Sequence, residues 1–206
     1  MYTVYNEEEN RFELVEEPDP SLRYTYADYL KWKFEEQVEL IKGRIVKMSP
    51  APNTKHQIIA GNLFVLMKNF LKKQKCQVFI APFDVRLPKK NKIRDSEITT
   101  VVQPDLCIVC DESKIDQKGC LGSPDLVMEV LSTGNTKKEV KLKYELYEES
   151  GVKEYWLVYP AEENIAVFIL NPEGRYDGAK IYAGRDLIYS SAIKGFVVKL
   201  SEVFTK

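Results

Sequence analysis

Two acidic residues stand in segments that otherwise have the composition of buried strands. Glu129 interrupts the apolar run DLVMEVL, and Asp105, which follows Pro104, starts the apolar run DLCIVC. An ionised carboxylate in such a place costs several kcal/mol unless a cation or strong hydrogen-bond donors meet it. A structural ion pair would account for either acid alone. Two acids on adjacent strands form a hard oxygen site, and this pairing favours binding of magnesium or manganese.

Lys143 is the cation that we expect to face these acids. At ~100° per residue, the turn of an α-helix, the segment KKEVKLKYELY places its other lysines on a charged side. Lys143 instead lies between Leu146 and Tyr147 on the apolar side. A lysine there either extends its ammonium group to water or meets a buried acid. Pairing with Glu139, one turn earlier, is a further alternative.

Asp125, in a second Pro-Asp pair, competes with Asp105 for a place in the metal site. It lies four residues before Glu129 in one extended run, and ~3.3 Å per residue separates the two by ~13 Å. That distance is too large for one ion, so we interpret Asp125 as a residue that starts a strand.

Several segments must position these residues. VELIKGRIVKMSP has Lys42-Gly43 between two apolar runs and predicts a β-hairpin with Glu39 in its first strand, followed by the loop SPAPNT. Residues 53–75 repeat apolar residues at helical spacing, which predicts a long amphipathic helix with His56 on its apolar side near the start.

Three strand-like runs follow, CQVFIAPFDVRLP, VVQPDLCIVC and DLVMEVLS. The last two are apolar on both faces, as is typical of central strands covered by helices on both sides. Residues 136–150 predict a second helix ended by Gly151, and EYWLVYP, AVFIL, AKIYA and DLIYS predict further strands. The fold class that we expect is α/β, a mixed central β-sheet flanked by helices, with additional C-terminal strands.

The length of 206 residues favours one domain with one core. Residues 1–23 are polar and contain prolines, so we expect a mobile or loosely docked arm. Thr25 then caps a predicted short helix that extends to Trp32. We therefore divide the chain into an N-terminal arm, residues 1–23, and a single domain, residues 24–206.

Composition excludes some classes of protein. No apolar run approaches the ~18 residues that span a bilayer, so a membrane protein is not expected. The acidic first twenty residues do not resemble a signal peptide, which favours a cytoplasmic location. A net charge of −1 gives no overall basic field, which argues against tight non-specific binding of nucleic acid. It does not exclude a local basic groove.

The four cysteines include one C-x-x-C pair, Cys107 and Cys110. On a strand, residues three apart point to opposite faces, so this pair should neither share a zinc ion nor form a redox bridge. We expect all four cysteines to be free structural thiols, which fits a reducing compartment.

An ordered set of motifs connects these observations. It comprises QPDL, then EVLS, then the spacing from Ser132 to Lys143 to Tyr147, and finally GVKEYWLVYP. With this set, the sequence from about Tyr24 to Phe204 resembles the Uma-two branch of the PD-(D/E)XK, or restriction-endonuclease-like, superfamily. Each motif is weak alone, and the combination is specific.

The resemblance implies roles for the residues singled out above. Asp105 and Glu129 would bind a divalent cation, Mg²⁺ or Mn²⁺, and Lys143 would assist the attacking water. Glu39, in VELIKG, matches a further acid that helps to complete the site, and it would also be a metal ligand. His56, Asp84 and Tyr147 match positions typical of the branch, with less defined roles; for His56, packing is the alternative to catalysis.

The sequence departs from the superfamily pattern at two positions. Leu131 stands where the usual E-x-K motif has its lysine, and Lys143 on the following helix takes the place of that lysine. Thr133 stands where the branch commonly has proline after the serine, which we expect to affect only the loop.

The function that the resemblance implies is metal-dependent hydrolysis of phosphodiester bonds, with DNA as substrate. The charged segment between the first two strand-like runs could contact phosphates through Lys89, Lys90, Lys92 and Arg94. The tip of a charged hairpin is, however, usually only solvated. A catalytically inactive binding protein and a hydrolase of smaller phosphoesters are the alternatives. The apolar residues 158–176 either cover the sheet or form a homodimer contact.

Overall fold

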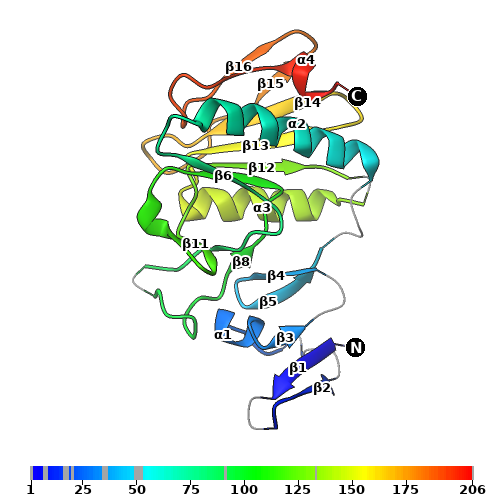
Figure 1. Cartoon of the computed structure of the whole chain (residues 1–206), viewed down its shortest axis with the longest axis vertical. Coiled ribbons are helices and arrows are strands. Elements are labelled where there is room, and N and C mark those ends of the chain that lie inside the picture. The colour runs from blue at the N-terminus through cyan, green and yellow to red at the C-terminus, as the bar shows by residue number, and fades with distance from the viewer. Residues whose placement is uncertain are drawn as a thin grey trace.

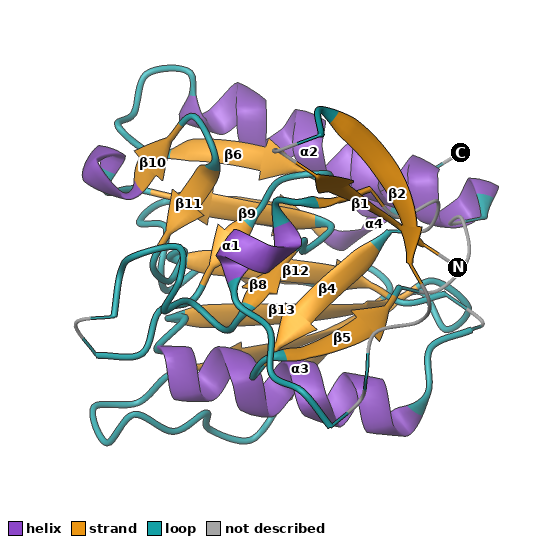
Figure 2. Cartoon of the chain, turned by 90° about the horizontal axis from the view of Figure 1, so that it is seen from below, coloured by secondary structure: helices purple, strands orange, loops and turns teal. Residues whose placement is uncertain are grey.

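The structure of the chain is a computed structural model that describes residues 2–6, 9–15, 19, 21–33, 37–48, 53–90, 92–132 and 134–205. Its centre consists of two six-stranded mixed sheets, and two long helices pack on opposite faces of one of them (Figures 1 and 2). The chain thus has a mixed α/β fold with additional C-terminal strands. The expected loop SPAPNT and Thr133 fall largely or wholly outside the described residues.

The sheet between the helices, called here the central sheet, has the strand order β15-β14-β13-β12-β9-β6. Its strands are β15 (Lys180–Ala183), β14 (Asn164–Ile169), β13 (Glu154–Tyr159), β12 (Leu126–Val130), β9 (Leu106–Val109) and β6 (Gln77–Ile80). β12 and β13 are parallel, and the helix α3 (Lys137–Ser150) connects them. The other neighbouring pairs are antiparallel.

The two faces of the central sheet have separate hydrophobic cores. The helix α2 (Thr54–Leu71) packs on one face, where Met128 of β12 contacts a core that includes Leu63 and Met67. α3 packs on the other face, where Val127 of β12 lies in a core with Leu146 and Tyr147. Successive residues of β12 therefore alternate between the two helices, which explains why this run is apolar on both faces apart from Glu129.

The second sheet, called here the hairpin sheet, has the order β10-β11-β7-β8-β4-β5. Its strands are β10 (Ile115–Asp116), β11 (Gly119–Leu121), β7 (Val85–Arg86), β8 (Val101–Val102), β4 (Val38–Ile41) and β5 (Arg44–Lys47). β4 and β5 form the predicted hairpin, with φ of +52° at Lys42 and +79° at Gly43. Positive φ at both central residues suits the twist of a two-residue hairpin.

One expectation needs correction, because two runs that suggested single strands of one sheet are each divided at a proline. The run that contains Pro82 supplies β6 to the central sheet and β7 to the hairpin sheet. The run that contains Pro104 supplies β8 and β9 in the same way. Proline has no N–H to donate to a strand ladder, so each run leaves one sheet there and enters the other.

Side-chain caps fix where the helices begin. Asn53 caps α2, and Thr136 and Glu139 form a capping box at the start of α3. The carboxylate of Glu139 accepts a hydrogen bond from the backbone N–H of Thr136. Gly151, with φ of +79°, ends α3 as the sequence predicts.

The N-terminal segment contains strands that the sequence did not predict. β1 (Tyr2–Asn6) pairs with β2 (Arg11–Val15) and with β3 (Trp32–Lys33). α1 (Tyr26–Tyr29) has the predicted cap at Thr25 but ends before Trp32, which lies in β3. The division of the chain after residue 23 stays a prediction.

The C-terminal segment closes over the central sheet. It contains β16 (Leu187–Tyr189), β17 (Val197–Lys199) and α4 (Leu200–Val203). The fully buried carboxylate of Glu154 accepts hydrogen bonds from the Ser190 hydroxyl and the Ala192 N–H, which attach the β16–β17 loop to β13. Residues 158–176 contain β14, which is a strand of the central sheet, and Tyr176 after it is buried against α3. These residues therefore form part of the sheet, and a homodimer contact stays a prediction.

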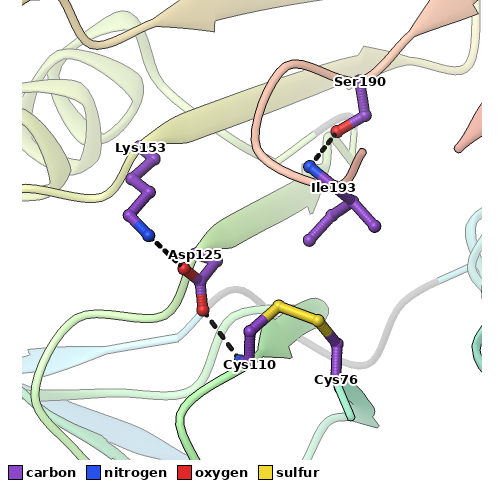
Figure 3. Close-up of a disulfide and its surroundings, with 6 residues drawn as sticks. All are labelled: Cys76, Cys110, Asp125, Lys153, Ser190 and Ile193. Atoms are coloured by element: carbon purple, nitrogen blue, oxygen red, sulfur yellow. Dashed lines mark hydrogen bonds and ion pairs between the residues drawn. A yellow bond between two sulfur atoms is a disulfide. The ribbon is translucent and has the colours of Figure 1, made fainter. Parts of the chain in front are cut away.

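The cysteines also require a correction. Cys76 and Cys110 form a disulfide (Figure 3), and only Cys107 and Cys120 are free and buried among the described residues. The strand argument did not apply to Cys110, because β9 ends at Val109. Gln77 of β6 pairs with Val109 of β9, so the residues that flank this pair, Cys76 and Cys110, lie side by side.

No helix in the described ranges is long and apolar enough to cross a bilayer.

Removing the disulfide should lower the free energy of unfolding by about 3–4 kcal/mol, because the bond restricts the unfolded chain across a sequence separation of 34 residues. Urea unfolding of Cys76→Ala and of the oxidised wild type measures this difference. The wild type with reductant should then unfold like the variant. Equal stability of oxidised wild type and variant would contradict the prediction.

Gly119→Ala should destabilise the fold by more than about 2 kcal/mol. Gly119 has φ of +117°, and a Cβ there would lie 2.2 Å from the backbone oxygen of Asp84. Gly178→Ala is the matched control, because nothing lies within 4 Å of its added Cβ. Thermal denaturation of both variants is the measurement, and similar losses in the two would contradict the prediction.

Candidate functional site

Charged side chains from both sheets and from α3 meet in one cavity. Glu39 extends from β4 of the hairpin sheet, Glu129 from β12 of the central sheet and Lys143 from α3. The cavity has a volume of about 260 Å³, and Asp105 and His56 also line it. The structure therefore brings together the four residues expected to carry the chemistry, with His56 beside them.

Local structure directs each of these side chains to the cavity. Glu129 follows Val127 by two positions on β12, so both side chains face α3. Lys143 and Tyr147 are one helical turn apart, so they share the face of α3 that packs on the sheet. The sequence-based orientation of Lys143 agrees with this placement.

The ammonium group of Lys143 bridges two carboxylates. Its Nζ lies 2.5 Å from Oε1 of Glu39 and 3.1 Å from Oε1 of Glu129. The side chain of Lys143 is 17% exposed, and those of Glu39 and Glu129 are 3% and 16% exposed. Lys143 therefore neither extends to water nor pairs with Glu139, the two alternatives considered above.

The hydroxyl group of Tyr147 donates a hydrogen bond of 2.6 Å to Oε1 of Glu129, the same oxygen that binds Lys143. The backbone N–H of Gln103 donates to Oε1 of Glu39 at 2.8 Å, again the oxygen that binds Lys143. Among the described residues, no hydrogen bond involves Oε2 of either glutamate. Each acid thus keeps one oxygen for another ligand.

Asp105 is held by different partners. His56 Nε2 lies 3.2 Å from Oδ1 of Asp105, and the backbone N–H of Val130 donates to Oδ2 at 2.7 Å. β9 and β12 are antiparallel neighbours, so this contact orients Asp105 toward the strand that carries Glu129. His56, at the first turn of α2, packs on the apolar side of that helix and also contacts the candidate site.

Burial and charge act against each other in this cluster. Burial, with the nearby carboxylates of Asp105 and Glu39, outweighs the attraction of Lys143 and raises the pKa of Glu129 to about 7. Burial opposes the charge of Lys143, but Glu129 and Glu39 outweigh it and raise the pKa of the ammonium group. Burial raises the pKa of Tyr147 as well, and Glu129 adds to this. Lys143 therefore stays charged, and Tyr147 stays a donor.

His56 has a raised pKa for a related reason. Burial lowers the pKa of the imidazole, but the hydrogen bond with Asp105 and its charge outweigh burial. Protonated His56 would neutralise part of the charge of Asp105.

The donor set fits a divalent cation in its chemistry. Glu39, Asp105 and Glu129 supply carboxylate oxygens, which are the ligands that Mg²⁺ and Mn²⁺ prefer. In the described part of the chain, however, no three His, Cys, Asp or Glu side chains are close enough together to hold an ion as they stand. The ammonium group of Lys143 lies between Glu39 and Glu129, so a bound cation would share these two carboxylates with it.

Asp84 lies outside the cavity, although the resemblance grouped it with the site. Its carboxylate accepts hydrogen bonds from the Tyr26 hydroxyl at 3.0 Å and from Nε2 of Gln103 at 2.8 Å. Gln103 was not singled out from the sequence. Its place at the start of the motif QPDL was the signal available in the sequence.

Other charged candidates also lie away from the cavity. The carboxylate of Asp125 accepts hydrogen bonds from the Cys110 N–H and from Lys153 (Figure 3), consistent with a residue at the start of β12. Arg94 pairs with Glu97, and Lys89, Lys90 and Lys92 are exposed. None of these residues lines the cavity.

Comparison with known proteins places the chain in a family. The family model described as "Uma2: Putative restriction endonuclease" matches residues 26–201. No curated protein matches the chain. Among solved structures, the crystal structure of "a putative nuclease belonging to DUF820" from Anabaena variabilis matches with a TM-score of 0.67 and 20% identity, over 87% of this chain and 97% of that chain.

At 20% identity this structural likeness shows the fold alone, whereas the family model covers most of the chain. The chain therefore belongs to the Uma2 family, whose members are described as putative restriction endonucleases.

Proposed function

We propose that this protein is a metal-dependent endonuclease with the restriction-endonuclease-like, or PD-(D/E)XK, fold, and that it hydrolyses phosphodiester bonds in DNA. The observation that carries the proposal is the Lys143 ammonium group, which bridges Glu39 and Glu129 in a cavity that Asp105 also lines. A lysine and three carboxylates at one buried place suit phosphoryl chemistry, because charge develops on phosphate oxygens during the reaction.

Glu39, Asp105 and Glu129 would hold Mg²⁺ or Mn²⁺ through their carboxylate oxygens. When bound, the ion would polarise the scissile phosphate and lower the pKa of a water molecule. The Oε2 atoms of Glu39 and Glu129 accept no hydrogen bond from a described residue, so they would be the first oxygens available to the ion.

Lys143 would orient the attacking water and stabilise the developing negative charge. It would act as a hydrogen-bond donor, because its ammonium group already donates to Glu39 and Glu129. Tyr147 would hold Oε1 of Glu129, and His56 would hold Oδ1 of Asp105. These two residues would orient the ligands. The Val130 N–H also donates to Oδ2 of Asp105, so Asp105 would share its oxygens with the ion.

The substrate and the location of the protein are parts of the same proposal. Membership of the Uma2 family supports a nucleic acid as substrate. The exposed lysines near Lys90 would contribute weak backbone contacts only, because they lie outside the cavity. A DNA substrate in turn favours a cytoplasmic location.

Cleavage of plasmid and single-stranded DNA with Mg²⁺ or Mn²⁺ tests the proposal. Asp105→Ala and Lys143→Ala should lose about 100-fold or more in rate, because each removes a group that acts on the reacting phosphate. Lys141→Ala is the matched control, because Lys141 lies on the same helix, is 75% exposed and pairs with Glu145. Circular dichroism would verify that each variant is folded.

The results of these assays distinguish an endonuclease from a hydrolase of smaller phosphoesters and from a binding protein. Cleavage of nucleotides without cleavage of DNA or RNA would indicate a hydrolase of smaller phosphoesters. No cleavage of any substrate by wild type with either metal would overturn the proposal in favour of a binding protein. Lys143→Ala should bind Mn²⁺ at least as tightly as wild type, because it loses a competing cation, so retained binding with lost cleavage would assign Lys143 to the chemical step.

Tyr147→Phe should lower the free energy of unfolding by about 1–2 kcal/mol and slow cleavage, since it removes a hydrogen bond to Glu129 and keeps the packing of the ring. Tyr155→Phe is the matched control, because the buried hydroxyl of Tyr155 has no hydrogen-bond partner in the described chain. Tyr155→Phe should be as stable as wild type. Equal stability and rates for both variants would contradict a role for the Tyr147 hydroxyl.

A further inference from the structure

Gln103 connects the hairpin sheet to the candidate site through its backbone. It lies after β8 and directly before Pro104, where the chain crosses from the hairpin sheet to the central sheet. Its N–H donates to Oε1 of Glu39 at 2.8 Å. Asp105 follows two residues later, so one short peptide contacts Glu39 and carries Asp105.

The side chain of Gln103 anchors this peptide. Its Nε2 donates to Oδ1 of Asp84 at 2.8 Å and to the hydroxyl oxygen of Tyr29 at 3.2 Å. Both donor hydrogens of the amide group therefore have partners. The amide joins β8 to α1 and to the loop before β7.

Asp84 is itself fixed from two further directions. The Tyr26 hydroxyl donates to its Oδ2 at 3.0 Å, and its backbone oxygen accepts from the Cys120 N–H at 2.8 Å. The absence of a side chain at Gly119 permits this close approach of β11. Asp84 does not line the cavity, so it would reach the site only through Gln103.

We propose that Gln103 is a positioning residue, which fixes Oε1 of Glu39 and thereby presents Oε2 to a divalent cation, with Asp84 as its anchor. Glu39 is almost fully buried, and Oε1 accepts hydrogen bonds from Gln103 and Lys143. If Lys143 shifts when a cation binds, the Gln103 N–H is the contact that keeps Glu39 in place. This inference rests on the proposed function for the identity of the ligand.

Mn²⁺ binding, measured by isothermal titration calorimetry on the full chain, is the first test. Gln103→Ala should weaken Mn²⁺ binding about tenfold or more, the usual effect of losing a residue that orients a metal ligand. Gln74→Ala is the control, because Gln74 is exposed just after α2 and does not line the cavity. Gln74→Ala should bind Mn²⁺ like wild type.

A double variant tests whether Gln103 acts through Glu39. In a Glu39→Gln background, Gln103→Ala should cause little further loss of Mn²⁺ affinity, because the group that it positions is no longer an acid. Asp84→Ala should weaken Mn²⁺ binding relative to wild type. Added to Gln103→Ala, it should cause little further loss of Mn²⁺ affinity. Thermal denaturation of the same variants measures how much stability each one loses. Losses of Mn²⁺ affinity that came only from reduced folding would add up in the double variants.

Unchanged Mn²⁺ affinity in Gln103→Ala, additive losses in the double variants, or no Mn²⁺ binding by wild type would overturn the inference. The failure of the proposed function is a different result. If wild type binds Mn²⁺, Gln103→Ala weakens it and DNA stays intact, the positioning role stands and the nuclease proposal fails. If wild type cleaves DNA and Gln103→Ala binds Mn²⁺ equally well, the nuclease proposal stands and Gln103 has no positioning role.

Discussion

The ammonium group of Lys143 joins parts of the chain that lie far apart in sequence. Glu39 precedes it by 104 residues and Glu129 by 14, and these acids belong to different sheets. Without a cation at this point, the carboxylates would repel one another in surroundings of low dielectric constant. The approach of the hairpin sheet to the central sheet at the cavity therefore depends on this positive charge.

The same requirement supports the proposal that the site binds a metal ion. Burial and neighbouring acids hold the pKa of Glu129 well above its ordinary range, so the cluster gains from any added positive charge. The partners of the acids are placed asymmetrically: Tyr147 and Gln103 each bind the glutamate oxygen that Lys143 also binds. The two glutamates therefore bind the positive charge of Lys143 through Oε1 and leave Oε2 for a second positive charge.

Sequence reasoning predicted the parts of the molecule that depend on local patterns. The inward side of Lys143 follows from helical periodicity, and the placement of Glu39 follows from the hairpin around Lys42-Gly43. It failed where two segments must first be paired. The disulfide of Cys76 and Cys110 depends on the register of β6 with β9, and Gln103 became visible only through contacts with Glu39 and Asp84. Apolar composition also concealed that the runs through Pro82 and Pro104 each serve two sheets.

α3 has a consequence for how sites of this kind change over time. It connects the parallel strands β12 and β13, and it lies across the face of the central sheet on which Glu129 opens. A long side chain on this helix and one on the strand itself can therefore deliver a cation to nearly the same point in space. The cationic nitrogen can thus keep its position in the site although the residue that supplies it has a different position in the sequence. A sequence alignment would then fail to match the two lysines, whereas superposition of the structures would place their Nζ atoms together.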